Sequence, residues 1–303
     1  MALKDIKGKI AATNRMHKVT RAMEAVSAVK MRKTQLAALS GRPYARAALQ
    51  ILARLSGSEE LLRHPLSREH VSIHNIALVV ITSDRGLAGA LNSGLIKLAS
   101  ETISAYPQSA IAVYAYGKKG QEYFARRGYE IVRSFENKTD DVDRAVMDKL
   151  SVELTEAFIA ERYDEVLVVY NNFRSTFEHV PTVRRLLPLS ITVLQQLVQD
   201  IAPEHGKFSQ LHGVDAVPVY TIEPAEEEVL GILVPRLTSV ALYHMLLESK
   251  ASEHSARMVA MKNASDKSKE VAANLTHEYN KIRQAAITRE VSEIVGGREA
   301  LAA

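Results

Sequence analysis

The sequence predicts an α/β fold with a long antiparallel coiled coil of N- and C-terminal helices and an inserted Rossmann-like α/β domain. Both ends of the 303-residue chain show helical periodicity over lengths that do not fit inside a globular domain. The middle instead alternates apolar strand-like runs with helical segments. We therefore expect an N-terminal coiled-coil helix over 1–56, an inserted α/β domain over 72–222 and a C-terminal coiled-coil helix over 223–303.

The N-terminal helix is predicted over residues 2–56, which are rich in the helix formers Ala, Met, Lys, Arg and Leu. Steps of three or four residues place one stripe on this helix, made of Leu3, Ile6, Ile10, Thr13, Met16, Val19, Met23 and Val26. Gly41-Arg42-Pro43 predicts a kink or a break, because proline lacks a backbone donor and clashes with the preceding turn. Residues 55–72, with Gly57, Pro65 and several charges, are expected to form a linker.

The C-terminal helical pattern begins at Glu223, and Gly296-Gly297 is expected to end it. Its core positions alternate steps of three and four: Leu237, Val240, His244, Leu247, Ala251, His254, Met258, Met261, Ser265, Ser268, Ala272, Leu275, Tyr279, Ile282 and Ala286. This heptad predicts a left-handed supercoil against the N-terminal stripe. Several core positions are Ala, Ser, His or Met, so the rod should be modestly stable alone and should gain from a sleeve of partner protein.

The middle of the chain predicts a mainly parallel sheet, because helices separate most of its apolar strands. Strands are expected over 75–82, 110–116, 129–135, 165–170, 177–188 and 217–220. Helices are expected over 88–104, 118–127 and 141–162, and the polar stretch 195–215 is interpreted as helix plus loop.

Charge and composition narrow the possible functions. The first 56 residues carry twelve basic and two acidic side chains, a net +10 in a chain whose total is +4, which implies an acidic partner surface. Nucleic acid is one such partner; a solvated helix face is the other interpretation. No run of about 18 apolar residues predicts a membrane span. The absence of Cys excludes disulfides, thiol nucleophiles and cysteine-based metal sites.

The best candidate for a ligand loop is Ser83-Asp84-Arg85-Gly86-Leu87-Ala88-Gly89, after the first strand of the sheet. Such a turn can direct backbone amides at a phosphate, which would suit an α/β enzyme or sensor. It matches neither known glycine-rich phosphate motif, and a tight structural turn is the favoured interpretation. His70 and His74 lack further metal ligands, and no catalytic constellation is present, so we expect no cofactor and no metal.

Four segments resemble one known family. ATNRMHKVTRAMEAVSAVKMRKTQ (12–35), SDRGLAGALN (83–92), LLESKASEHSARMVAMKNASD (246–266) and YNKIRQAAITREVSEIVGG (279–297) are similar to signatures of the γ subunit of F-type ATP synthase, in family order. Ala stands at 88 and 90, where that family commonly has Cys and Gly. Residues 190–216 match no motif.

The resemblance implies the central rotor shaft of an ATP synthase, non-catalytic itself. It implies that the shaft transmits torque between the ion-driven membrane ring and the catalytic hexamer. The implied partners are the α and β subunits, the ε subunit and the c-subunit ring, with no nucleic acid and no direct membrane insertion. The implied location is peripheral, on the cytoplasmic face of the bacterial inner membrane. Motif matching assigns five partner-binding residues: Met23, Arg283, Gln284, Thr288 and Glu290.

Overall fold

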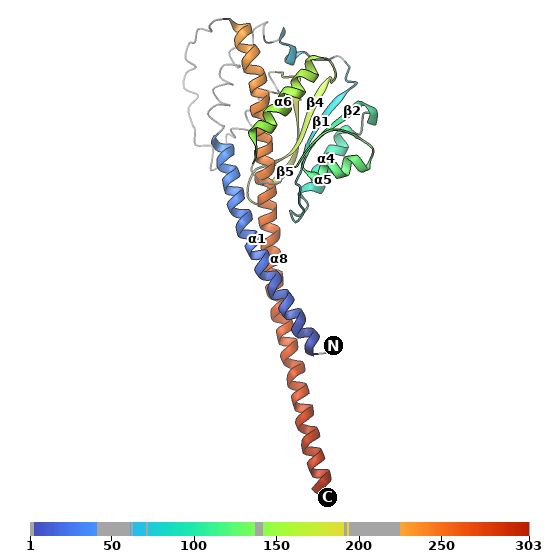
Figure 1. The fold of residues 1–303 in the computed structure, drawn as a ribbon, viewed down its shortest axis with the longest axis vertical. Coiled ribbons are helices and arrows are strands. Elements are labelled where there is room, and N and C mark those ends of the chain that lie inside the picture. The colour runs from blue at the N-terminus through green and yellow to red at the C-terminus, as the bar shows by residue number, and fades with distance from the viewer. Residues whose placement is uncertain are drawn as a thin grey trace. The chain divides into compact units, whose positions relative to one another are not determined.

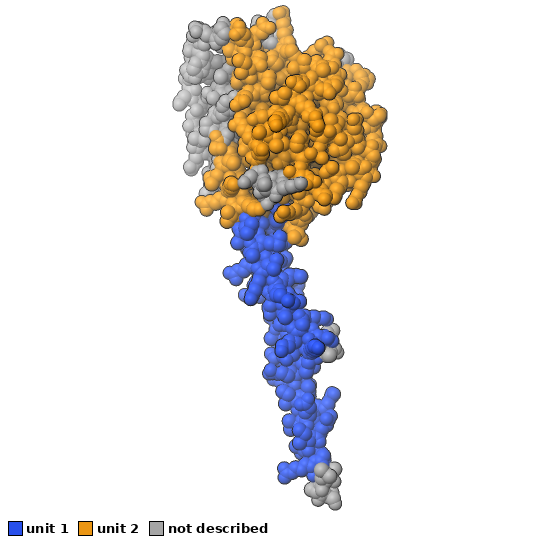
Figure 2. Space-filling model, in the orientation of Figure 1, with its two compact units in different colours: residues 1–28, 257–303 blue, residues 29–256 orange. Residues whose placement is uncertain are grey.

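The computed structural model describes residues 3–40, 61, 63–70, 72–136, 142–190, 193 and 225–302 (Figure 1). In chain order the elements are α1 (Leu3–Ser40), η1 (Pro65–Ser67), β1 (Ile76–Ile81), α4 (Leu91–Ile103), η2 (Gln108–Ala110), β2 (Ile111–Tyr116), α5 (Lys118–Arg126), β3 (Glu130–Phe135), α6 (Arg144–Ile159), β4 (Glu165–Phe173), β5 (His179–Leu187) and α8 (Glu226–Ala302). They form two compact units, residues 1–28 with 257–303, and residues 29–256 (Figure 2). Both long helices contribute to both units.

The larger unit, residues 29–256, contains one five-stranded sheet of order β3-β2-β1-β4-β5. β1 pairs in parallel with β2 and β4, and β2 pairs in parallel with β3. β5 is antiparallel to β4, since a short turn joins them. The mainly parallel sheet is therefore confirmed, and five of the six predicted strands are present. The sixth, at 217–220, and the stretch 195–215 lie outside the described residues.

Each face of this sheet packs into its own apolar cluster. Alternate β1 residues such as Leu78 and Val80 pack with α4 and α5 on one face, through Leu95 and Phe124. The opposite face packs with α6 and with α8, whose Leu230, Val234, Leu237, Leu242 and Leu246 are buried there. The C-terminal helix is therefore part of the core of this unit. The clean alternation along β1 follows from the two-residue period of a strand.

The predicted linker over 55–72 is wrong within the described residues. Leu61 is 2% exposed, and Leu66, in the short helix η1, is fully buried; both belong to the cluster that contains α8. The linker was predicted from the charges of this segment, but burial of these two leucines in the apolar cluster gives a favourable free energy that holds it in place.

One 18-residue window of α8 is apolar enough, by length and composition, to cross a membrane, and 56% of that window is buried inside the protein. Buried leucines of the apolar cluster explain this composition, because a core helix needs an apolar face all along the contact.

The smaller unit, residues 1–28 with 257–303, is an antiparallel helix pair. In this unit α1 and α8 run in opposite directions (Figure 1), and His17 Nδ1 lies 3.0 Å from the carbonyl oxygen of Ser265. Along α8 the predicted core positions Met261, Ser265, Ser268 and Ala272 are buried, while the residues between them are mostly exposed. The antiparallel pairing and the heptad are therefore confirmed.

The predicted N-terminal stripe is correct as far as Thr13 and again at Met23, which is half-buried. Met16, Val19 and Val26 are 60%, 57% and 54% exposed, whereas Thr20 and Ser27 are buried. The true seam follows Ile6 at intervals of seven, since a supercoiled pair keeps a period of 3.5 residues, and the predicted stripe stepped too often by three. The buried hydroxyls of Thr20 and Ser27 are satisfied by carbonyls four residues earlier in their own helix.

The predicted helix end at Gly296-Gly297 is also wrong. α8 continues through both glycines to Ala302, a length of 77 residues that also includes Pro235. A glycine ends a helix when it adopts a left-handed conformation, and neither of these two does so. In a right-handed helix each costs only about 1 kcal/mol relative to alanine. The predicted kink at 41–43 lies outside the described residues.

The burial pattern of α1 predicts opposite outcomes for two substitutions. Ile6→Ala should lower the free energy of unfolding of the helix pair by about 2–5 kcal/mol, because it leaves a cavity in the seam. Met16→Ala, at an exposed position of the same helix, should change it by less than about 0.5 kcal/mol. Thermal unfolding followed by helical circular dichroism distinguishes them. Equal effects would contradict the seam assignment.

Candidate functional site

A polar stretch of α8, residues 248–255, packs against the carboxyl ends of the central strands. All eight of its residues are buried, although only Ala251 is apolar. We call this stretch the docking segment.

Three serine hydroxyls of the docking segment bind strand-end carbonyls. Ser249 Oγ donates to the carbonyl of Ile81, the last residue of β1, at 3.2 Å. Ser252 Oγ donates to the carbonyl of Asn171 in β4 at 3.2 Å, and Ser255 Oγ donates to the carbonyl of Thr176, in the β4–β5 turn, at 2.7 Å. Because residues three apart lie on one face of a helix, a single face of α8 binds carbonyls of β1, of β4 and of the β4–β5 turn.

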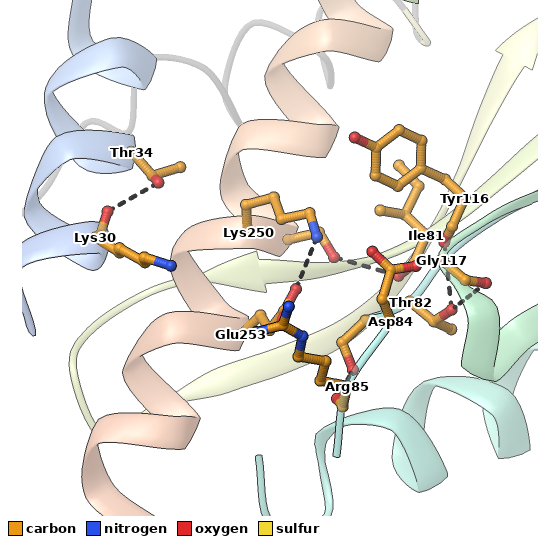
Figure 3. A network of polar contacts seen from close by, with 12 residues as sticks. Lys30, Thr34, Ile81, Thr82, Asp84, Arg85, Tyr116, Gly117, Lys250 and Glu253 are labelled. Atoms are coloured by element: carbon orange, nitrogen blue, oxygen red, sulfur yellow. Dashed lines mark hydrogen bonds and ion pairs between the residues drawn. The ribbon is translucent and has the colours of Figure 1, made fainter. Parts of the chain in front are cut away.

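A buried ion pair lies beside these hydroxyls. Lys250 Nζ is 2.9 Å from Glu253 Oε2, and both side chains are almost inaccessible to water (Figure 3). Lys250 Nζ is also 5.5 Å from the ring centroid of Tyr116, the last residue of β2. Burial raises the pKa of Tyr116, and the negative charges of Asp84, Glu253 and Asp143 raise it further, so its hydroxyl stays neutral. A buried charge is tolerated only when it is paired, so Lys250 and Glu253 depend on each other.

The candidate ligand loop at 83–89 is a structural junction. Asp84 Oδ1 accepts a hydrogen bond from the Lys118 backbone N–H at 3.0 Å. Thr82 Oγ1 accepts one from the Gly120 N–H at 2.8 Å, and the Ser83 carbonyl accepts one from Lys119 N–H. Residues 82–84 thus supply acceptors to the first amides of α5 and join the loop to that helix.

Two glycines of this region have positive φ angles. Gly117 has φ +95°, and a Cβ there would lie 2.1 Å from the Thr82 carbonyl oxygen, so no other residue fits. Gly89 has φ +58°, next to Leu87, a non-glycine residue with φ 64°. Close packing therefore requires glycine at 117, whereas at Gly89 only the backbone conformation favours it.

The two histidines considered as metal ligands serve other contacts. His70 Nδ1 is 3.4 Å from Asp164 Oδ1, and His74 Nε2 is 2.9 Å from Ser72 Oγ. Across the part of the chain that the structure describes, no group of three or more His, Cys, Asp or Glu residues could hold a metal ion.

The predicted partner-binding residues are split between two places in the helix pair. Arg283, Gln284, Thr288 and Glu290 are exposed on α8, whereas Met23 is half-buried on α1. His17 meets Ser265, and the helices run in opposite directions from there. At 1.5 Å per residue Met23 and Arg283 are then about 36 Å apart along the pair. The structure brings together the four α8 residues but not Met23.

The docking segment itself was missed by sequence reasoning, which assigned its histidine and alanine to a soft coiled-coil seam. The available signal was the recurrence of serine at 249, 252 and 255, too regular for a solvated face and too polar for a seam.

The protein is therefore an α/β protein with an antiparallel helix pair, and the long helix α8 contributes to both. Comparison with known proteins identifies its family. The family model described as "ATP synthase" matches residues 2–301. The ATP synthase gamma chain of Roseiflexus sp. (strain RS-1) is 39% identical, over 99% of this chain and 98% of that protein. The gamma chain of Moorella thermoacetica is 36% identical over 99% of both chains.

Solved structures agree with this fold. A chain in the OSCP/F1/c-ring structure of the Euglena gracilis mitochondrial ATP synthase is similar with a TM-score of 0.63 and 19% identity, over 99% of this chain and 94% of that one. A chain of the Tetrahymena thermophila central stalk/c-ring structure gives a TM-score of 0.57 at 24% identity, over 82% of this chain and 99% of that one. The chain belongs to the ATP synthase gamma-chain family, and so to the peripheral F1 part of an ATP synthase.

The buried ion pair predicts a non-additive mutant cycle. Lys250→Met and Glu253→Gln should each lower the free energy of unfolding by about 3–5 kcal/mol, since each removes one partner of a buried ion pair. The double variant should lose much less than the sum of the two. Chemical denaturation of the four proteins measures the coupling, and additive losses would show that the two charges do not depend on each other.

Proposed function

We propose that the chain is the central rotor shaft of an F-type ATP synthase. It transmits torque between the ion-driven membrane ring and the catalytic hexamer of α and β subunits during ATP synthesis or hydrolysis. The observation that carries the proposal is the paired helix of residues 3–28 and 257–302 in a chain of the gamma family. A long helix pair suits a shaft, because two helices wound around each other resist bending and twisting.

The surface of the helix pair supports a surrounding partner. Met16, Val19 and Val26 of α1 are exposed, and so are Ile287, Val291 and Ile294 of α8. Apolar side chains of this size, in repeated positions on exposed helix faces, indicate protein contacts. The +10 charge of the first 56 residues favours an acidic contact within the roughly 8 Å over which salt permits attraction. The β subunits of the hexamer supply such a surface by family resemblance.

The α/β domain, proposed over 72–222 between helices 1–56 and 223–303, then contacts the ε subunit and the c-subunit ring. Neither nucleic acid nor direct insertion into the bilayer belongs to this role. The shaft lies at the cytoplasmic face of the bacterial inner membrane as a peripheral protein.

In this proposal the chain is non-catalytic, and ATP is bound by the hexamer. The structural role of residues 82–84 supports this, because their oxygens accept hydrogen bonds from the first amides of α5. Isothermal titration of the purified chain with Mg-ATP should show no binding up to millimolar concentration. Micromolar binding would instead support the phosphate-site interpretation.

Arg283 and Gln284 should bind partner subunits from their exposed positions on α8, together with Thr288 and Glu290, and Met23 should do so separately on α1. Arg283→Ala or Gln284→Ala should reduce ATP-driven proton pumping by reconstituted complexes, since a lost charge-assisted hydrogen bond costs about 1.5–3 kcal/mol. Helical content should not change, because both side chains lie beside the seam.

The matched control for these two variants is Lys281→Ala, an exposed neighbour in the same helix turn that motif matching leaves unassigned. Pumping unchanged in all three variants would remove Arg283 and Gln284 from the contact set, and a loss of helicity would place them in the seam.

A further inference from the structure

The sheet has a topological switch point beside β1. β1 lies between β2, which follows it in the chain through α4, and β4, which returns on the other side after β3 and α6. In open parallel sheets the crevice outside the carboxyl ends of two such strands is where ligands bind. A chain with this fold is therefore expected to carry a crevice at the ends of β1 and β4.

In this protein α8 occupies that position. Ser249 binds the carbonyl at the end of β1, and Ser252 binds a carbonyl near the end of β4. Lys250, between them in the sequence, faces the ring of Tyr116 at the end of β2 (Figure 3). The docking segment therefore touches three neighbouring strand ends, and every one of these contacts lies within residues 29–256.

Polar contacts hold a helix in a way that apolar contacts do not. Burial of apolar surface is non-directional, whereas a hydrogen bond to a fixed carbonyl depends on its angle. Hydrogen bonds weaken steeply when their angle falls below about 120°, so rotation of α8 would break the bonds of Ser249 and Ser252 together. Rotation would also move Lys250 and Glu253, whose ion pair is buried.

We infer that the ligand crevice of this fold has become a socket whose occupant is α8 itself. Ser249, Ser252 and Lys250 are the positioning residues that prevent α8 from turning within the α/β unit. This inference rests on the proposed function and deepens it, because it names the joint at which torque passes between the α/β unit and the shaft helix.

The test compares Ser249→Ala/Ser252→Ala with Ser268→Ala in reconstituted complexes. Ser268 is the matched control, because its hydroxyl binds the Ala264 carbonyl of its own helix and no strand. Protons pumped per ATP hydrolysed should fall in the double variant while hydrolysis continues. The Ser268→Ala variant should pump like the wild type, and Ser249→Thr/Ser252→Thr, which retains both hydroxyls, should recover pumping. An unchanged pumping ratio in the double alanine variant would overturn the inference.

Hydrogen–deuterium exchange on the whole isolated chain provides a second measurement that does not depend on assembly. Loss of two net hydrogen bonds should speed amide exchange across 248–255 by about tenfold or more, without a similar change at 258–272. An equal change in exchange rate in both segments would overturn the inference even if the variant failed to assemble. A wild-type chain that does not restore pumping would instead refute the proposed function and leave the socket geometry in place.

Discussion

The hydrogen bonds from one face of α8 to the strand-end carbonyls are the constraint on which the rest of the structure depends. Through them, and through the apolar contacts of Leu242 and Leu246, a single helix of 77 residues becomes part of the core of the α/β unit. The same helix then continues as one of the two helices of the antiparallel pair. α8 is helical on both sides of the boundary between the two units, at residues 256 and 257.

The composition of the helix pair is consistent with a shaft that turns inside a partner. Its seam holds small and hydroxyl-bearing residues, such as Thr20, Ser27 and Ser265, whose polar groups are satisfied locally. Such residues let the helices approach closely but bury little apolar surface, so the pair gains limited stability from its own seam. Larger apolar side chains face outward instead, where only another protein can cover them.

The long elements were predictable from the sequence because each satisfies one strong period. The heptad of α8 is confirmed from Met261 to Ala272, where every predicted core position is buried, and the strands were found from continuous apolar runs. The stripe of α1 was wrong at Met16, Val19 and Val26, because apolar residues at helical spacing do not show by themselves which of them are buried. Leu61 and Leu66 were missed because two leucines among charges carry no period.

The candidate site was less predictable for a physical reason. Sequence patterns locate apolar faces, whereas the docking segment is a polar face buried against backbone carbonyls, which have no residue identity. Phosphate binding at 83–89 was weighed from the glycines alone. The acceptors that occupy the α5 amides come from Thr82, Ser83 and Asp84, and only three-dimensional placement shows what they bind.

The most direct measurement of the central claim is rotation of the α/β unit in a single complex. The chain contains no cysteine, so Lys97→Cys, at an exposed position on α4, gives one attachment point for an optical marker. With the catalytic hexamer fixed to a surface, the account predicts stepwise, unidirectional rotation of the marker when ATP is added. A marker that stays still while the same complexes hydrolyse ATP would contradict it, because torque on α8 would then not reach the α/β unit.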